Sequence, residues 1–178
     1  GGQVTVTLTV DGRCPAVTEP ADVALVFDTS RSMNWHGALG RGRDLAIALL
    51  GGLDPTAVRA TLVTFDSDAR VEVPLTEDLS LVARRVAALD AWGDSKLGQG
   101  LLRAADELNG TKAAAGVRRV VVVVTDGEHT DVVRDIGETL RASGVEIMAI
   151  VLPHGGVGGT RYALETLTGD PQRVLVDP

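Results

Sequence analysis

Five oxygen-bearing side chains in three separate segments are the residues of this chain whose types and spacing suit shared chemistry. Asp28, Ser30 and Ser32 lie in the run FDTSRSM, Ser95 lies in GDSKLGQGL, and Asp126 lies in VVVVTDGEHTD. Carboxylate and hydroxyl oxygens are the hard ligands that Mg²⁺ and Mn²⁺ prefer, with Ca²⁺ as a further candidate. Because hydroxyls are neutral, such a site carries only the charge of its two carboxylates, and a bound cation would still attract an anionic ligand.

Two of these segments directly follow apolar runs. Residues 22–27 (DVALVF) precede Asp28, and residues 118–125 (RRVVVVVT) precede Asp126. Continuous hydrophobicity of this kind is typical of strands that are covered on both faces of a sheet. Because the loops at the carboxyl ends of neighbouring parallel strands converge on one crevice, we expect the oxygens to meet there.

The remaining pattern alternates strands with helices. Further strands are expected at residues 59–65, 69–74, 145–152 and 172–176, and helices at residues 37–53, 78–89, 97–108, 131–143 and 160–167. The short turn 66–68 makes the first two of these strands a hairpin, and Pro74, which lacks an N–H group, belongs at a sheet edge. The sequence therefore predicts an α/β fold with an open, mostly parallel central sheet, one antiparallel edge strand and helices on both faces.

The first twenty residues differ in character from the rest. Residues 3–10 (QVTVTLTV) alternate Thr with Val or Leu, which is typical of an exposed or edge strand, and a connector with Pro15 and Pro20 follows. We therefore divide the chain into an N-terminal strand and linker, residues 1–20, and a principal domain, residues 21–178. The N-terminal strand belongs either to this domain or to the end of a preceding one, and we expect a larger multidomain protein.

Composition and charge argue against several classes of function. The formal net charge of -7 disfavours nucleic-acid binding, because phosphate recognition needs a basic face. The longest purely apolar run, residues 120–124, is far too short to span a bilayer, so no membrane insertion is expected from this segment. The single cysteine, Cys14, cannot form an internal disulfide, and in a secreted protein its partner would lie outside this chain.

Three motifs in this order resemble those of the von Willebrand factor type A (vWA) domain, also called the integrin I-domain fold. They are Asp28-x-Ser30-x-Ser32, Ser95-x-x-Gly98-x-Gly100-Leu101 and Thr125-Asp126-Gly127. A lone DxSxS run would be a weak signal, but the three motifs in order, each in the expected context, are specific. The resemblance extends from about residue 22 to the C-terminus and implies a Rossmann-like fold.

The resemblance also implies a metal-ion-dependent adhesion site. Its five protein positions would be Asp28, Ser30, Ser32, Ser95 and Asp126. The first two serines would bind the cation directly, and the aspartates directly or through water. A sixth position would be left for an Asp or Glu carboxylate of a protein partner, with no catalytic residue. This chain departs from the family in having Ser95 where Thr is usual and Arg31 where Gly is common.

Each of these residues also has an ordinary structural interpretation. Asp28, Ser30 and Ser32 are residue types that cap turns and helix starts, Ser95 is a candidate helix N-cap, and Asp126 could belong to a plain turn. Found alone, Ser95 would favour that interpretation, and the FDTSRSM run would leave the two interpretations about equal. Found together after buried strands, they favour the metal site.

Other residues near these loops are weaker candidates. His129 is interpreted as a surface histidine, since the histidines of the chain lack zinc-like spacing, and Asp131 as a helix cap. The glycines at 155–159 match neither a P-loop nor a dinucleotide fingerprint. Trp35 and Trp92 either form a rim that contacts a partner or are partly buried in the core.

Three functions are compatible with such a site. The first, which we expect, is a protein-binding module in a bacterial protein that lies outside the cell or at the cell surface. The second is an intracellular assembly domain of a multi-subunit ATPase- or chelatase-type machine, which would be cytoplasmic. The third is a metal-dependent phosphohydrolase, but no GxSxG elbow, P-loop lysine or Cys/His pair appears in the sequence.

Overall fold

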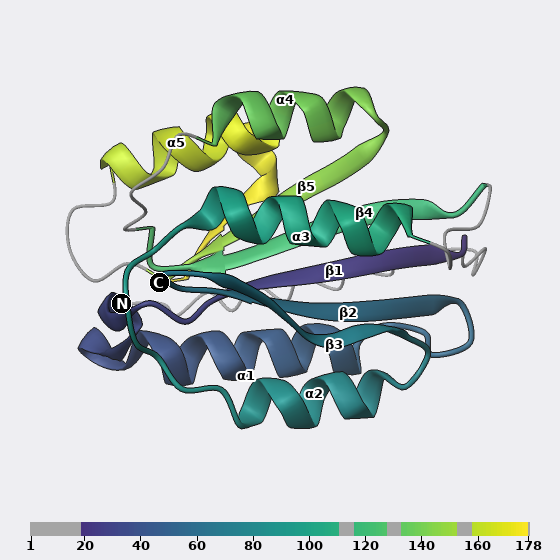
Figure 1. Cartoon of the computed structure of the whole chain (residues 1–178), viewed down its shortest axis with the longest axis horizontal. Coiled ribbons are helices and arrows are strands. Elements are labelled where there is room, and N and C mark those ends of the chain that lie inside the picture. The colour runs from purple at the N-terminus through teal and green to yellow at the C-terminus, as the bar shows by residue number, and fades with distance from the viewer. Residues whose placement is uncertain (1–18, 111–115, 128–132, 153–157, 178) are drawn as a thin grey trace, which may run out of the picture.

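An open sheet lies between two layers of helices in the computed structural model, which describes residues 19–110, 116–127, 133–152 and 158–177 (Figure 1). The strands are β1 (Ala21–Asp28), β2 (Val58–Phe65), β3 (Ala69–Thr76), β4 (Arg118–Thr125), β5 (Val145–Val151) and β6 (Val174–Val176). Their order across the sheet is β3-β2-β1-β4-β5-β6; β2 and β3 are antiparallel, and the other neighbouring pairs are parallel. The predicted α/β fold with one antiparallel edge strand is confirmed. The predicted strand at residues 3–10 and Cys14 lie outside the described residues.

The middle of the sheet consists of β1 and β4, as their continuous hydrophobicity predicts. Residues 22–28 of β1 and residues 121–125 of β4 are all buried. A central parallel strand has a neighbour at each edge and helices over both faces, so apolar side chains fit along most of its length. The polar residues Asp28 and Thr125 stand at the carboxyl ends of these strands, where the sheet gives way to loops.

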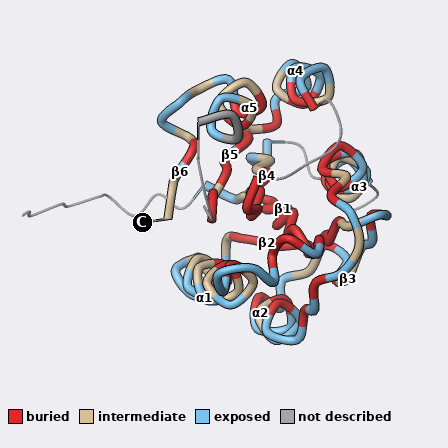
Figure 2. The backbone as a smooth tube through the Cα atoms, turned by 90° about the vertical axis from the view of Figure 1, so that its left-hand side faces the viewer, coloured by how far each residue is buried: buried red, intermediate tan, exposed pale blue. Residues whose placement is uncertain are grey.

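The helices divide between the two faces of the sheet. On one face lie α1 (Ala38–Gly51) and α2 (Leu79–Ala87), and on the other lie α3 (Leu97–Asn109), α4 (Arg134–Ala142) and α5 (Gly158–Thr168) (Figure 1). Two short 3₁₀ segments, η1 (Arg31–Gly37) and η2 (Pro171–Arg173), precede α1 and β6. Figure 2 shows the buried side of the helices turned towards the sheet. Two hydrophobic cores result, one on each face.

Close packing explains why the second motif has a glycine at position 100. A Cβ atom at this position would lie 3.0 Å from both Phe65 Cδ1 and Val26 Cγ1, which is tighter than an ordinary van der Waals contact. The first turn of α3 therefore lies directly against β1 and β2. This close packing holds the loop before α3, which contains Ser95, beside the end of β1.

Some element boundaries differ from those expected. The helix predicted at residues 37–53 is α1, which is preceded by η1; the last two residues of η1, His36 and Gly37, have left-handed φ angles of 50° and 72°. The predicted strand at residues 172–176 begins as η2, so β6 has only three residues. Of the helix predicted at residues 131–143, the structure describes α4 from Arg134, and Asp131 lies outside the described residues.

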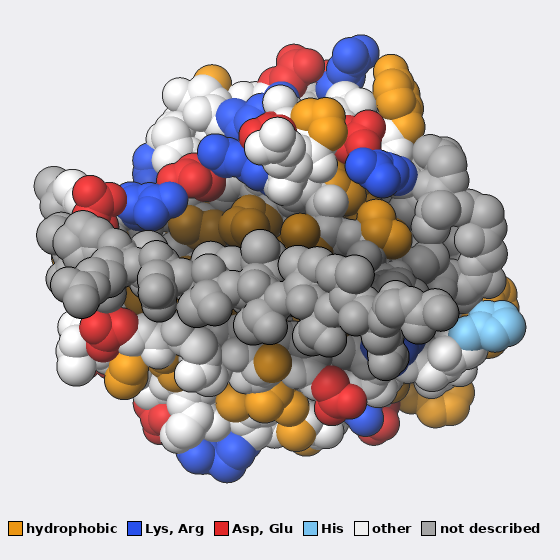
Figure 3. Space-filling model, turned by 180° about the vertical axis from the view of Figure 1, so that it is seen from behind, with side chains coloured by type: hydrophobic (Ala, Val, Ile, Leu, Met, Phe, Trp, Pro, Cys, Tyr) orange, Lys and Arg blue, Asp and Glu red, His pale blue; other side chains and the backbone are white. Residues whose placement is uncertain are grey.

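The described surface mixes the two signs of charge. On the face shown in Figure 3, Lys and Arg side chains lie interspersed with Asp and Glu side chains. At the amino end of β5, for example, Glu146 pairs with both Arg118 and Arg173. Among the described helices, none is long and apolar enough to cross a membrane.

Candidate metal-binding site

The candidate site lies where the sheet order reverses. The chain forms β1, β2 and β3 on one side of the sheet and then returns to form β4 on the other side of β1. Open α/β sheets bind ligands at this switch point, outside the carboxyl ends of the strands. Asp28 ends β1, and Asp126 directly follows β4, so both aspartates lie at this crevice.

Asp28 is at the centre of the site. Its carboxylate is fully buried; Oδ1 accepts a hydrogen bond from the Ser30 backbone N–H at 2.8 Å. Oδ2 accepts from the Thr125 hydroxyl at 2.6 Å and, over a long 3.4 Å, from the Ser95 hydroxyl. Donors from all three predicted segments therefore converge on this one carboxylate.

Ser30 and Ser32 face each other within the first segment. Their hydroxyl oxygens are 3.1 Å apart, and both residues are buried. The turn that brings them together is fixed by the Asp28–Ser30 hydrogen bond, a typical role of Asp at a turn, and by the Met33 N–H, which donates to the Ser30 carbonyl at 3.2 Å. The buried Met33 side chain anchors this segment in the core beneath α1 and α2.

Asp126 is also buried, at 4% exposure. It occupies the position between Thr125, which bonds Asp28, and Gly127. Gly127 has a left-handed φ of 88°, and its N–H donates to the Thr125 hydroxyl at 2.9 Å. The third motif is therefore a tight turn that requires glycine and orients the Thr125 hydroxyl towards Asp28.

Burial raises the pKa of Asp28 to about 7, and the nearby charge of Asp126 acts in the same direction. The hydrogen bonds from Ser30 and Thr125 act in the opposite direction, because they stabilise the ionised carboxylate. The two carboxylates thus repel each other, and burial removes them from the solvent that would stabilise their charges. A proton or a cation bound between them would relieve both costs.

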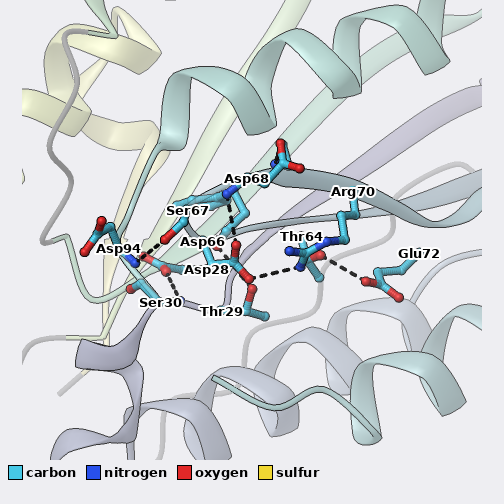
Figure 4. A network of polar contacts seen from close by, with 12 residues as sticks. Asp28, Thr29, Ser30, Thr64, Asp66, Ser67, Asp68, Arg70, Glu72 and Asp94 are labelled. Carbon is cyan, nitrogen blue, oxygen red and sulfur yellow. Dashed lines mark hydrogen bonds and ion pairs between the residues drawn. The ribbon is translucent and has the colours of Figure 1, made fainter. Parts of the chain in front are cut away.

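The loops around Asp28 are tied to each other by backbone hydrogen bonds. The Trp92 N–H donates to the Thr29 carbonyl at 2.7 Å, and the Arg31 N–H donates to the Gly93 carbonyl at 3.1 Å. Figure 4 shows that the turn between β2 and β3 joins them, where the Ser67 hydroxyl accepts from the Asp94 N–H at 2.9 Å. The serine hydroxyls therefore sit on interlocked loops rather than on a single flexible one.

The structure brings four of the five predicted residues into one hydrogen-bonded group, namely Asp28, Ser30, Ser32 and Ser95. The fifth, Asp126, adjoins the group through Thr125 and acts on Asp28 through its charge. The ordinary interpretation of Ser95 as an N-cap is wrong, because the N-cap of α3 is Lys96 and no side chain bonds there. Arg31 is exposed, as are Trp35 and Trp92, while His129 lies outside the described residues.

The contact of Thr125 with Asp28 is one that sequence analysis missed. Phe27 pairs with Val124 across the sheet, which places the following residues, Asp28 and Thr125, at neighbouring positions. The available signal was this register: a lone polar residue ends a run of five valines, level with the aspartate of the first motif. Threonine is common in strands for other reasons, so the sequence alone did not single it out.

The donor set fits a hard divalent cation. Nowhere in the described ranges do three or more His, Cys, Asp or Glu side chains form a potential metal-binding group, so a site here depends on hydroxyls as well as carboxylates. Neighbouring ligands of an octahedral Mg²⁺ are about 2.9 Å apart, given bonds of 2.0–2.1 Å. The 3.1 Å between the Ser30 and Ser32 hydroxyls is close to that value.

Comparison with known proteins identifies the family. The von Willebrand factor type A domain family matches residues 22–177, which is most of the chain. The chain belongs to the von Willebrand factor type A domain family. The three motifs of this vWA domain thus have the structural context that their resemblance implied.

Two curated relatives show where vWA domains of this kind occur. The chain is 32% identical over 171 residues to matrilin-1 of Mus musculus, covering 90% of this chain and 33% of matrilin-1. It is 30% identical over 147 residues to the collagen alpha-4(VI) chain of the same species, covering 76% of this chain and 6% of the collagen chain. The vWA domain therefore spans a third or less of these relatives. Both are animal proteins and give no support to the expected bacterial origin.

One solved structure supports the fold. Proximal thread matrix protein 1 from the mussel byssus, in a form with a zinc-occupied MIDAS motif, superposes with a TM-score of 0.75 at 22% identity. The match covers 89% of this chain and 41% of the mussel chain. At this identity the likeness concerns the fold.

Proposed function

We propose that this vWA domain is a metal-dependent protein-binding module. Asp28, Ser30, Ser32, Ser95 and Asp126 hold a divalent cation in this proposal, Mg²⁺ first, with Mn²⁺ or Ca²⁺ as alternatives. The cation, when bound, supplies a coordination position for an Asp or Glu carboxylate of the partner. The observation that carries the proposal is the buried hydrogen-bonded group of hydroxyls around Asp28 at the switch point of the sheet.

The residues of the chain have separate tasks in this proposal. The two aspartates supply the negative charge that attracts a cation, and burial prevents water from satisfying them instead. The three serines add neutral oxygens, so the total ligand charge stays low enough for an incoming carboxylate to be attracted. Thr125 keeps Asp28 oriented through its 2.6 Å hydrogen bond.

The relatives support this function in kind. The mussel protein of similar fold is described with a zinc-occupied MIDAS motif, which is the type of site proposed here. Matrilin-1 and the collagen alpha-4(VI) chain are much longer than this domain, which supports a module within a larger chain. Because both are matrix proteins, we also propose a location outside the cell. The acidic net charge and the mixed surface support a protein partner rather than a nucleic acid.

Thermal unfolding with added metal tests the proposal. In protein stripped with EDTA, a cation that binds only the folded state stabilises it by about 2.7 kcal/mol at 100 times its Kd. For a domain of this size we expect Tm to rise by roughly 5–10 °C. Asp126→Asn should abolish this rise.

The matched control is Asp94→Asn, the same chemical change at an exposed residue beside Ser95. It should retain the rise in Tm. A Tm that stays constant with millimolar Mg²⁺, Mn²⁺ and Ca²⁺, or that rises equally in Asp126→Asn, would contradict the proposal.

Catalysis is the alternative that needs its own measurement. We expect no hydrolysis of a generic aryl phosphate in the presence of Mg²⁺, because the proposal contains no nucleophile or general base. Turnover by the wild-type domain that disappears in Asp126→Asn would instead favour the phosphohydrolase.

A further inference from the structure

A pocket lies directly beside the candidate metal site, on the side of the β2–β3 hairpin. Its volume is about 270 Å³, and its lining includes Thr29, which stands between Asp28 and Ser30 in the chain. Glu72 of β3 and Trp92 of the loop between α2 and α3 also line it. We call it the side pocket. Its volume is below the range of most small-molecule pockets and suits a single side chain.

Two acidic residues of the side pocket are held by arginines of the same pocket. Arg70 donates to Asp66 at 3.0 Å, and Arg85 donates to Glu72 at 2.8 Å. Figure 4 shows Asp66, Arg70 and Glu72 in the same view as Asp28, with dashed lines that join Asp66 to Arg70 and Thr64 to Glu72. Within each ion pair the two charges neutralise each other. The sign of the net charge of the pocket therefore depends on its other charged residues.

The other charges are acidic. Asp90 lines the pocket, its side chain is 85% exposed, and its ion-pair contact with Arg43 is long, at 3.8 Å. Asp68 adds to this field: the hydrogen bond to Asp66 and the charges of Asp66 and Asp68 together raise the pKa of Arg70. A positively charged side chain is therefore favoured at the mouth of the pocket, and a negatively charged one is repelled.

Trp92 adds an aromatic surface to the same place. The residue is 72% exposed, although its backbone N–H is fixed by the hydrogen bond to Thr29. The next residue, Gly93, has a left-handed φ of 79° and packs so closely on Ser67 that a Cβ atom would lie 2.7 Å from the Ser67 hydroxyl. The backbone of this loop is thus constrained, and the Trp92 side chain on it is largely exposed to solvent. Tryptophan is the side chain with the strongest attraction for cations over its face.

We propose that the side pocket receives a lysine or arginine side chain of the protein partner, between Trp92 and Asp90. The part of this inference that concerns a partner rests on the proposed function. Because Thr29 belongs to both the metal-site segment and the side pocket, the basic residue lies within a few residues of the carboxylate that the cation captures. The partner therefore carries a mixed acidic and basic motif rather than an acidic run.

Binding of a basic side chain to the side pocket can be measured without the metal. The probes are Nα-acetyl-arginine amide, Nα-acetyl-glutamine amide and Nα-acetyl-glutamate amide, each titrated into the EDTA-treated domain and followed by the indole N–H signals in NMR spectra. The signals of Trp92 and Trp35 are told apart with Trp92→Phe. We expect a saturable shift of the Trp92 signal with the arginine probe, roughly fivefold stronger binding than with the glutamine probe, and a smaller effect on Trp35.

Asp90→Lys should weaken binding of the arginine probe by roughly fivefold, because it replaces the exposed acidic charge by a basic one. The matched control is Asp106→Lys, the same change at an exposed position of α3, on the other face of the sheet, and it should leave binding unchanged. Equal binding of arginine and glutamine probes, stronger binding of the glutamate probe, or equal loss in both variants would overturn the inference.

A second titration separates this inference from the proposed function. Capped Asp-Ala-Arg and Asp-Ala-Gln peptides are compared in Mg²⁺ and in EDTA. If both functions hold, the arginine peptide binds roughly fivefold more tightly, both peptides need Mg²⁺ for full affinity, and Asp90→Lys removes only the arginine advantage. If neither peptide responds to Mg²⁺, the metal-dependent function fails, and the arginine probe in EDTA still decides the side pocket. If both respond equally to Mg²⁺ with no arginine advantage, the side-pocket inference fails alone.

Discussion

The two ends of β1 each bury an aspartate, but they compensate its charge differently. Asp22, 1% exposed, lies at the amino end and receives two hydrogen bonds of 2.7 Å from the Arg59 guanidinium. Asp28, at the carboxyl end, receives hydrogen bonds from neutral hydroxyls and an amide, and another carboxylate lies nearby. One end of the strand thus carries its own cation, and the other end is suited to receive one. We infer that the first is structural and that the second is functional.

The largest expected effect is at the amino end. Arg59→Met leaves the buried Asp22 charge without its guanidinium, and losing one partner of a buried ion pair costs about 3–5 kcal/mol. Urea unfolding at neutral pH measures this loss. Combining it with Asp22→Leu should recover most of the stability, because an apolar pair needs no compensation. A double variant no more stable than Arg59→Met would show that the ion pair is not the source of the effect.

At the carboxyl end, removing the charge of the buried aspartate should stabilise the metal-free domain rather than destabilise it. The pKa of Asp28 is raised from its ordinary value of 3.8 to about 7, so between these values the folded, metal-free domain binds a proton that the unfolded chain does not. The contribution of this group to stability is therefore present at low pH and is lost as the pH rises towards 7. Asp28→Asn removes that loss, because the amide is neutral and the surrounding hydroxyls can rotate to accept from it.

We expect metal-free Asp28→Asn to be more stable than wild type above pH 7, by on the order of 4 kcal/mol, and to lose this advantage near pH 4. Urea unfolding of both proteins in EDTA across this pH range measures the difference. A variant that is less stable than wild type at pH 8 would remove the contrast between the two ends of β1.

A smaller effect is expected from the Thr125 hydroxyl. Thr125→Val keeps the shape of the side chain and removes both hydrogen bonds of the hydroxyl, the 2.6 Å bond donated to Asp28 and the 2.9 Å bond accepted from the Gly127 N–H. Hydrogen bonds to charged groups contribute about 1.5–3 kcal/mol, against about 1 kcal/mol for neutral ones. The matched control is Thr61→Val, a buried threonine that donates to the neutral Val73 carbonyl at 2.8 Å. In EDTA at pH 8, Thr125→Val should cost more than Thr61→Val; equal losses would indicate that Asp28 is not ionised there.

The smallest effect concerns the departure from the family at position 95. Ser95→Thr keeps the hydroxyl, so the stabilisation by Mg²⁺ should stay within about 0.5 kcal/mol of the wild-type value, as for a tolerated substitution. Ser95→Ala removes the oxygen and should reduce that stabilisation clearly. Thermal unfolding with and without Mg²⁺ compares the two. Equal behaviour of both variants would remove Ser95 from the set of ligands.

The sequence predicted the carboxyl-end site of β1, because the residues of this site directly follow recognisable strands. The valine run before Thr125 and the apolar run before Asp28 indicated two central strands, and parallel strands bring their carboxyl ends together. The residues of the candidate metal site could therefore be grouped from the sequence alone. Gly100 and Gly127 also appeared in the motifs, although the reasons for them, close packing on Phe65 and a left-handed turn, came only from the structure.

Other features depend on contacts between distant segments and gave no local signal. The left-handed conformation of His36, just before the helix predicted at residues 37–53, had no signal in the sequence, because such a φ is uncommon for a residue other than glycine. The side pocket forms only when the β2–β3 turn meets the loop before α3, through the hydrogen bond from Asp94 to Ser67. Charge balance within such a pocket cannot be read from sequence order.

Anomalous diffraction from a crystal grown with Mn²⁺ tests the central claim most directly. We expect one strong anomalous peak at the carboxyl ends of β1 and β4, about 2–2.6 Å from the hydroxyl oxygens of Ser30 and Ser32. The same peak should be missing from crystals of Asp126→Asn. A well-ordered wild-type crystal that has no anomalous peak in this crevice, or whose only strong peak lies elsewhere in the molecule, would contradict the account.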